Sequence, residues 1–210
     1  MSTLAPAATS RAERILARFG GYWLFVLIPV VVTIAAEHPT TRPLLDWLCS
    51  YSPERFVHGR VWTLPASAFL VPHLTAIGPT MILTVAILLP FVLLRGLWET
   101  VVVFFSGHIV STLMVLAVTL PGAALGIPWL QQVYFARDVG ASAGLTAAAG
   151  ALAVFLSRAH PEVGAAIGAG VIGFLVVNAL LHPETAGRVL ADVEHALAFL
   201  TGCIVEWRMS

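Results

Sequence analysis

The chain has 210 residues, of which 59% are hydrophobic and only 10% are charged, and its formal net charge is zero. A soluble domain carries about 25% charged residues, so this chain has too few to cover a water-facing surface, and we expect a polytopic membrane protein. The zero net charge argues against a nucleic-acid partner. The two cysteines, Cys49 and Cys203, fit neither a disulfide framework nor a metal site.

Apolar stretches recur along the chain at lengths typical of membrane helices. A membrane helix needs about 20 residues, which leaves room for roughly six spans and their loops. We expect these spans at about residues 20–36, 74–94, 97–120, 140–156, 163–181 and 190–205. The predicted fold is an all-α bundle of six transmembrane helices, with residues 1–19 as a cytoplasmic N-terminal tail and residues 20–207 as one membrane domain.

The loop between the first two spans, residues 37–73, mixes leucines, aromatic side chains and charges. That composition is typical of short helices that lie in the membrane interface, and an ordinary structured loop is the alternative.

The orientation is predicted from the basic residues Arg11, Arg14 and Arg18, which precede the first span. We expect that span to be retained rather than cleaved as a signal peptide, because further membrane segments follow it. Basic residues beside the first span usually fix it with that flank inside the cell, and six spans place both termini on one side. The prediction is a multi-pass protein of the cell membrane with both termini in the cytoplasm.

One serine stands between glycines where the fourth predicted span begins, in the segment Gly140-Ala141-Ser142-Ala143-Gly144. His195 stands near the start of the last span, 53 residues further on. Two crossings and two short turns account for that spacing, so both side chains should lie near the extracytoplasmic face. A serine hydroxyl becomes a nucleophile when a neighbouring base accepts its proton, and a neutral imidazole suits that task near pH 7.

Small residues share a helical face with each of the two candidates. Thr146, Ala149 and Gly150 follow Ser142 on one face, and Ala198 and Gly202 follow His195. Faces without bulky side chains let two membrane helices approach closely, although any one of these residues is also common in routine helix packing.

At these residues the chain resembles the rhomboid family of intramembrane serine proteases. The segment from Gly140 to Gly144 is similar to the family's GxSxG motif around the nucleophile, and Gly150 matches a small position two turns further on. His195 and Gly202 resemble the HxxGxxxG motif of the last span, with Ala198 in place of the first glycine. The resemblance implies a rhomboid-like six-helix bundle with a membrane-associated first loop.

Glu99 resembles a glutamate that recurs in this family at the turn into the third span. We expect it to have a structural role, accepting backbone hydrogen bonds in a loop. His108, within the third span, is either functional or a neutral histidine bonded to a neighbouring helix, which is the commoner case for an intramembrane histidine.

The chain departs from the family in its second span, where an HxxxN motif helps to bind the oxyanion. No asparagine stands four residues after His73. The donors that remain for an oxyanion are the backbone N–H of Ser142 and, in place of the missing side chain, His73 or Thr80. Loss of one such donor costs about 3–4 kcal/mol of transition-state stabilisation. The alternative for His73 is an ordinary histidine at the membrane interface.

The resemblance implies an intramembrane serine protease that cleaves membrane-protein substrates near the extracytoplasmic face with the Ser142–His195 dyad. The alternative is a catalytically weak or inactive rhomboid-like protein that binds membrane clients, which the missing HxxxN motif favours. A small transporter or channel is the third possibility, and it would require paired charges inside the spans. The expected partners are transmembrane proteins and the lipid bilayer, and no metal or organic cofactor is expected.

Overall fold

The structure, a computed structural model, describes residues 11–181 and 186–210. Its regular elements are all helical, and the described residues outside the helices include one isolated bridge between Tyr51 and Asp138. The expected all-α class is therefore confirmed. The elements are α1 (Arg11–Glu37), α2 (Arg42–Cys49), α3 (Pro53–Val57), α4 (Thr63–Ala66), η1 (Ser67–Phe69), α5 (Leu74–Leu83), η2 (Thr84–Leu88), α6 (Leu89–Arg95), α7 (Leu97–Ala124), α8 (Pro128–Phe135), α9 (Ser142–Ser157), α10 (Pro161–Leu181) and α11 (Ala186–Met209).

Four helical segments are long and apolar enough to cross a membrane: Phe19–Glu37, Leu74–Arg95, Leu97–Ala124 and Pro161–Asn178. They coincide with four of the six predicted spans. The fourth predicted span corresponds to α9, which is apolar but shorter, and the sixth corresponds to α11, which carries Asp192, Glu194 and Glu206. The structure is that of a membrane protein, and the number of crossings remains a prediction.

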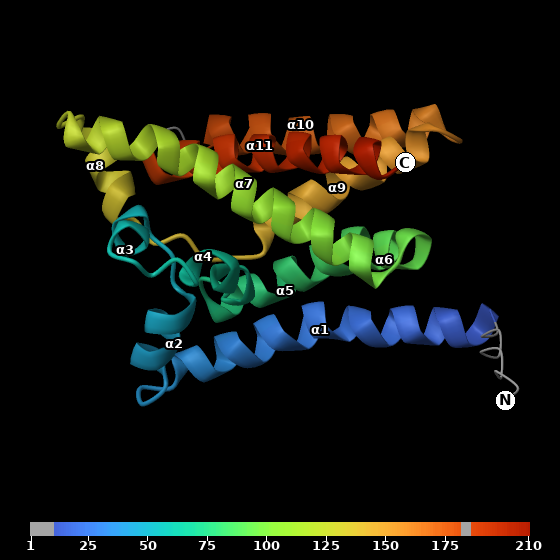
Figure 1. Cartoon of the computed structure of the whole chain (residues 1–210), viewed down its shortest axis with the longest axis horizontal. Coiled ribbons are helices and arrows are strands. Elements are labelled where there is room, and N and C mark those ends of the chain that lie inside the picture. The colour runs from blue at the N-terminus through green and yellow to red at the C-terminus, as the bar shows by residue number, and fades with distance from the viewer. Residues whose placement is uncertain (1–10, 182–185) are drawn as a thin grey trace, which may run out of the picture.

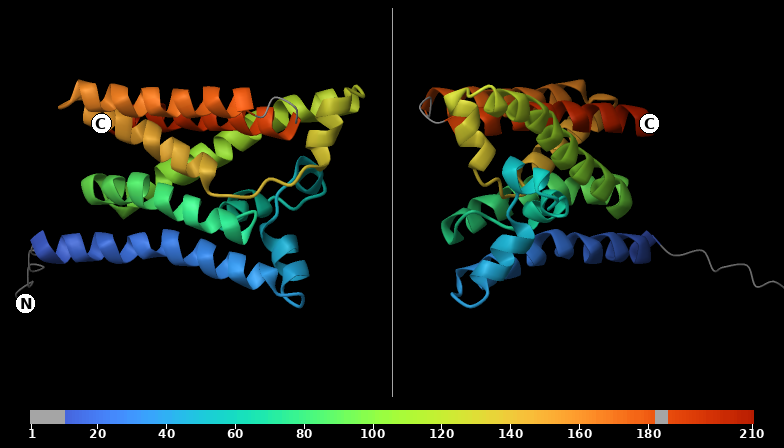
Figure 2. Two further views of the ribbon diagram at one scale, coloured as in Figure 1. Left: turned by 180° about the vertical axis from the view of Figure 1, so that it is seen from behind. Right: turned by 60° about the vertical axis from the view of Figure 1, so that its left-hand side comes forward.

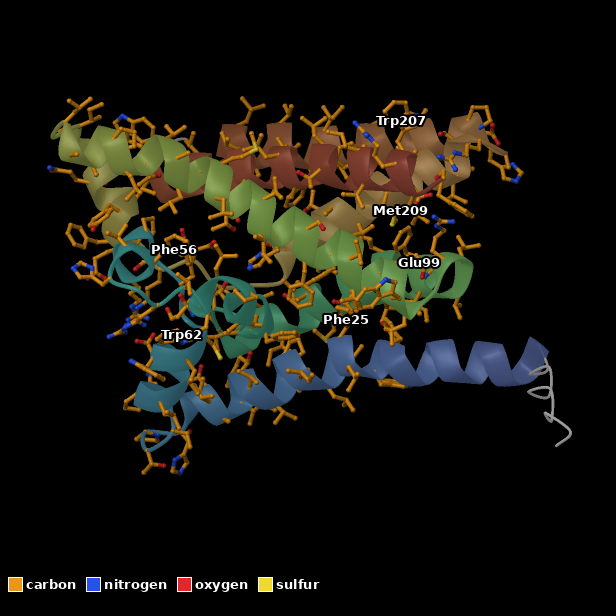
Figure 3. All side chains as sticks on the ribbon, in the orientation of Figure 1. Phe25, Phe56, Trp62, Glu99, Trp207 and Met209 are labelled. Atoms are coloured by element: carbon orange, nitrogen blue, oxygen red, sulfur yellow. The ribbon has the colours of Figure 1, made fainter. Side chains whose placement is uncertain are left out.

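Taken in chain order, the long helices α1, α5 with α6, α7, α9, α10 and α11 run in alternating directions, and α7 and α9 are inclined to the long axis of the molecule (Figure 1). The short helices α2, α3, α4 and α8 gather at one end, and the start of α1 and the end of α11 lie at the other end (Figures 1 and 2). Phe56 and Trp62 lie at the first end and Trp207 at the second (Figure 3). Aromatic side chains at both ends are typical of the two interfaces of a membrane protein.

The loop of residues 37–73 folds into short helices, as its composition predicts. Proline stands in the first turn of both α2 and α3, where its missing N–H costs nothing. The Ser52 hydroxyl caps α3 by accepting a hydrogen bond from the backbone N–H of Arg55 at 3.1 Å. The loop therefore has a defined structure of its own at one end of the bundle.

A π-helical turn, η2, divides the second apolar segment immediately before Pro90. A proline inside a helix removes one hydrogen bond and its ring clashes with the carbonyl four residues earlier. A wider turn accommodates that clash. The segment then ends at Gly96, whose φ of 109° allows the sharp turn into α7.

The centre of the bundle is α9, which packs against α7, α10 and α11. Ala147, Ala148 and Ala151 on α9 are fully buried, as is Ala198 on α11. Alanines on facing helices bring the backbones close together, so a short helix is surrounded by longer ones. This packing fixes the positions of the candidate site residues on α7, α9 and α11.

Candidate functional site

The register between α9 and α11 places Ser142 and His195 at the same level of the bundle. The Cys203 thiol donates a hydrogen bond to the Gly150 carbonyl at 3.4 Å, across 53 residues of sequence. Both helices run in the same direction (Figure 1), and the same spacing separates His195 from Ser142. Ser142 precedes Gly150, and His195 precedes Cys203, by the same eight residues, about two helical turns. The two candidate residues therefore lie at the same height on adjacent helices.

Three motif glycines lie where helices touch. A Cβ at Gly150 would overlap the Phe199 carbonyl oxygen of α11, and a Cβ at Gly202 would overlap the Ala147 carbonyl oxygen of α9. A Cβ at Gly144 would lie 2.6 Å from ring atoms of Phe104 on α7. These glycines are required by close packing, so their place in the motif has a structural reason.

Ser142 is the first residue of α9, and its side chain is exposed. Gly140, two residues earlier, has a φ of 134° and donates its N–H to the Ser67 carbonyl at 2.9 Å. Within the described residues, the Ser142 hydroxyl makes no hydrogen bond, so it is not joined to His195. The backbone N–H of Ser142 belongs to the first turn of α9, where N–H groups have no partner within the helix.

His195 is half-buried on α11. Its Nδ1 is fully buried and has no hydrogen-bond partner among the described residues. The negative charges of Asp138 and Asp192 act on the imidazole. Burial disfavours the charged imidazolium, and the two carboxylates partly oppose that effect, so the histidine is suited to act as a neutral base.

A group of ionisable side chains surrounds this region, and the sequence analysis did not assign them to the site. The carboxyl groups of Asp138 and Glu194 lie within hydrogen-bond reach of each other. The Thr112 hydroxyl of α7 donates to Glu194 Oε1 at 2.5 Å. Two carboxyl groups so close cannot both be ionised at low cost, so the pair shares one proton.

His108 of α7 is the second histidine near Asp138. Its Nε2 lies 2.9 Å from the Leu64 carbonyl oxygen and 3.0 Å from the Ser67 hydroxyl oxygen. A carbonyl can only accept, so Nε2 carries the proton, and the buried Nδ1 has no partner among the described residues. The His108 imidazole therefore bonds through Nε2 to the short helices α4 and η1, as expected for a histidine bonded to a neighbouring segment.

A cavity of about 200 Å³ opens onto this acidic pair and is lined by Tyr51, Thr112, Arg137, Asp138 and Glu194 together with apolar side chains. Burial raises the pKa of the Asp138 carboxyl, and the two nearby histidines, His108 and His195, partly oppose that shift. Burial and the charge of Asp138 raise the pKa of Tyr51. The cavity thus gathers ionisable groups that burial keeps in their neutral forms.

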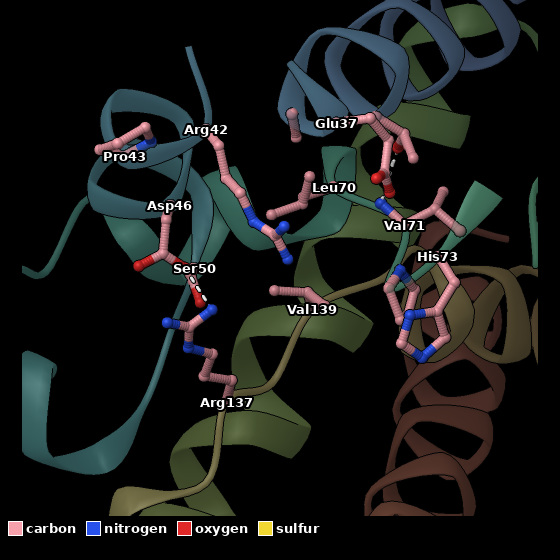
Figure 4. Close-up of a pocket in the computed structure, with 13 residues that line it drawn as sticks. Glu37, Arg42, Pro43, Asp46, Ser50, Leu70, Val71, His73, Arg137 and Val139 are labelled. Carbon is pink, nitrogen blue, oxygen red and sulfur yellow. Dashed lines mark hydrogen bonds and ion pairs between the residues drawn. The ribbon is translucent and has the colours of Figure 1, made fainter. Parts of the chain in front are cut away.

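The remaining predicted site residues lie elsewhere. His73 is exposed at the start of α5 and lines a different cavity (Figure 4). Thr80 lies within α5, and its carbonyl accepts a hydrogen bond from the Thr84 hydroxyl. Within the described residues, neither side chain is bonded to Ser142 or His195, so their part in an oxyanion site remains a prediction.

Glu99 lies half-buried in the first turn of α7, where Figure 3 labels it. In the described part of the chain its carboxylate has no hydrogen bond and no ion pair. The buried carboxylate at this end belongs to Glu206, which pairs with Arg95 at 3.2 Å.

The signals for the residues that the sequence analysis missed are weak but present. Asp138 stands four residues before Ser142 in the loop that leads to α9, and Glu194 is adjacent to His195. His108, Ser111 and Thr112 stand at i, i+3 and i+4, which is one face of a helix. Ionisable residues within membrane segments are by default candidates for function.

Among residues 11–181 and 186–210, no group of three histidine, cysteine or acidic side chains is arranged to hold a metal ion. Comparison with protein-family models finds no match to this sequence, and comparison with curated proteins finds none either.

Proposed function

We propose that this chain is a rhomboid-type intramembrane serine hydrolase, in which Ser142 is the nucleophile and His195 its base. The observation that carries the proposal is the α9–α11 register, which puts both residues at one level on adjacent helices. The proposal includes six membrane crossings with both termini in the cytoplasm. The site then faces the extracytoplasmic side, and the substrates are transmembrane proteins.

The proposed reaction begins with a change of rotamer at Ser142. A serine has one side-chain dihedral with three staggered positions, the hydroxyl of Ser142 is exposed, and the proposal requires the rotamer that turns it toward His195. His195 takes the proton as the oxygen attacks the scissile carbonyl, and later gives it to the leaving amine. Water then releases the acyl group from Ser142.

The oxyanion forms at the N-terminus of α9. The unpaired N–H groups there, including that of Ser142, carry partial positive charge that stabilises a negative oxygen. This donor set needs no side chain from α5, so it agrees with the absence of an asparagine four residues after His73.

Asp138 supports the base in this proposal. Its negative charge acts on His195 and stabilises the imidazolium that forms during the attack. Glu194 shares a proton with Asp138 and so sets how much of that negative charge is available. The proposed centre is therefore a serine and a histidine with an acidic pair behind them.

A rhomboid-like protein that binds membrane clients without cleaving them is the second candidate. Two observations favour it: the described residues contain no hydrogen bond between Ser142 and His195, and His73 lacks its asparagine partner. A client-binding protein needs the close helix packing but does not need an activated serine.

Cleavage in proteoliposomes separates the two candidates. Purified protein is reconstituted with single-span membrane proteins, and the products are mapped by mass spectrometry. The hydrolase proposal predicts fragments with the wild type and with the control Ser157→Ala, an exposed serine at the far end of α9, and none with Ser142→Ala. Substrates that co-purify but remain intact would favour the client-binding candidate.

A further inference from the structure

A second cavity lies apart from the acidic pair. Its volume is about 580 Å³, and it lies between the end of α1, the helix α2, the segment before α5 and the loop that leads to α9 (Figure 4). Its walls combine charged and apolar side chains, including Glu37, Arg42, Leu70, Val71, His73 and Val139. Cavities of 300–1,000 Å³ with a few polar groups are typical of small-molecule sites.

Two charged side chains in this cavity lack a partner among the described residues. Arg42 extends from α2 toward Leu70 and Val139, and Glu37 at the end of α1 stands on another wall (Figure 4). The other acidic group, Asp46, is already paired with Arg55 at 2.9 Å and with Arg137 at 2.8 Å. Within the part of the chain that the structure describes, Arg42 and Glu37 thus face this cavity unpaired, and they form no ion pair with each other.

The cavity lies at the boundary of the apolar segments. Glu37 ends the apolar segment of α1, and α5 begins just after His73. Large apolar side chains are exposed on the same two helices next to it, namely Val31, Ile34 and Leu74. Apolar surface beside a charged cavity suits a molecule with acyl chains and a charged head.

We propose that this cavity binds the headgroup of an aminophospholipid, with its phosphate against Arg42 and its primary ammonium against Glu37. A guanidinium recognises phosphate oxygens through several hydrogen bonds, and an ammonium donates hydrogen bonds to a carboxylate. The acyl chains then lie along the exposed side chains of α1 and α5. This inference does not depend on the proposed hydrolase activity.

The test uses the full-length protein, delipidated in detergent, with binding of added lipids measured by native mass spectrometry. Phosphatidylethanolamine is compared with phosphatidylcholine, which carries the same phosphate but a quaternary amine without N–H groups. The wild type should bind phosphatidylethanolamine at least tenfold more tightly than phosphatidylcholine. Arg42→Ala should remove that binding and Arg42→Lys should restore most of it, while Glu37→Gln should abolish the preference between the two lipids.

Arg60→Ala is the matched control, because Arg60 lies at the same end of the molecule, stacks over Trp47 and does not line the cavity. It should bind both lipids as the wild type does. Each variant's melting temperature is measured to establish that it is folded. Equal binding of the two lipids by the wild type would overturn the proposal. Arg42-dependent binding of inorganic phosphate as tight as that of the lipid would also overturn it, since the site would then be one for a free anion.

Discussion

The Asp138 carboxyl interacts electrostatically with side chains from three parts of the chain. Its charge acts on Tyr51 in the first loop, on His108 of α7 and on His195 of α11, and its carboxyl group meets that of Glu194. The chain has few charged residues, and ionisable residues in membrane proteins are by default candidates for function. The proposed function gives this cluster the task of supporting the catalytic base.

A substitution of Asp138 should change how stability depends on pH. Burial raises the pKa of this carboxyl in the folded protein, so the unfolded chain releases the proton at lower pH than the folded one. The contribution of this carboxyl to stability is therefore largest below its pKa in the unfolded chain, about 4, and is lost as the pH rises through its pKa in the folded protein. In Asp138→Asn, the melting temperature measured across that pH range should fall less steeply with rising pH than it does in the wild type.

The control for this measurement is Glu162→Gln, whose carboxylate is largely exposed at the start of α10. It should reproduce the wild-type pH dependence. An unchanged slope in Asp138→Asn would mean that the acidic pair is not held protonated by burial.

At the scale of helices, the close contact between α9 and α11 positions Ser142 and His195 at the same height. Gly202→Ala places a Cβ on the Ala147 carbonyl, and backbone cannot move aside as a side chain can. Overpacking of this kind costs about 1–3 kcal/mol. We expect a lower melting temperature in detergent, together with weaker cleavage because the register of Ser142 and His195 shifts.

Gly173→Ala is the matched control, since a Cβ at Gly173 on α10 meets nothing within 4 Å. Alanine favours helix over glycine by about 1 kcal/mol, so this variant should be as stable as the wild type or more stable. Equal stability of Gly202→Ala and Gly173→Ala would contradict the close approach of α9 and α11.

A buried ion pair stabilises the C-terminal end of α11. The Glu206 carboxylate is fully buried and lies 3.2 Å from Arg95 Nε, and the Arg95 guanidinium lies over the Phe155 ring of α9. Removing one partner of a buried ion pair costs about 3–5 kcal/mol. Glu206→Ala should therefore lower the unfolding free energy by that amount, measured by thermal or denaturant unfolding in detergent.

For comparison, Glu162→Ala should change the unfolding free energy by no more than about 0.5 kcal/mol, because its side chain is largely exposed. If both substitutions had similar effects, the Arg95–Glu206 pair would not stabilise the end of the bundle.

At the scale of the whole molecule, hydropathy predicts the helical class and four of the membrane segments, because long apolar runs have few other stable forms. It does not establish that α9 and α11 are spans. The helix α9 is short and largely buried by its neighbours, and α11 carries the buried carboxyl groups of Glu194 and Glu206. Both features depend on packing, which local sequence does not contain.

The acidic site is harder to predict because it joins segments that are distant in sequence. Thr112 and Glu194 are 82 residues apart, and Ser67 and His108 are 41 residues apart. The spacing of Ser142 and His195 predicts their common height, since it depends only on helix lengths. The orientation of the Ser142 side chain depends on its surroundings, and in the described residues its hydroxyl is exposed and makes no hydrogen bond to His195.

The central claim, an activated serine at Ser142, is tested most directly by labelling the detergent-solubilised protein with a fluorophosphonate serine probe. The account predicts labelling of the wild type and of Ser157→Ala, and its loss in Ser142→Ala and His195→Ala. A folded wild type that does not label, or a His195→Ala variant that labels as the wild type does, would contradict the claim.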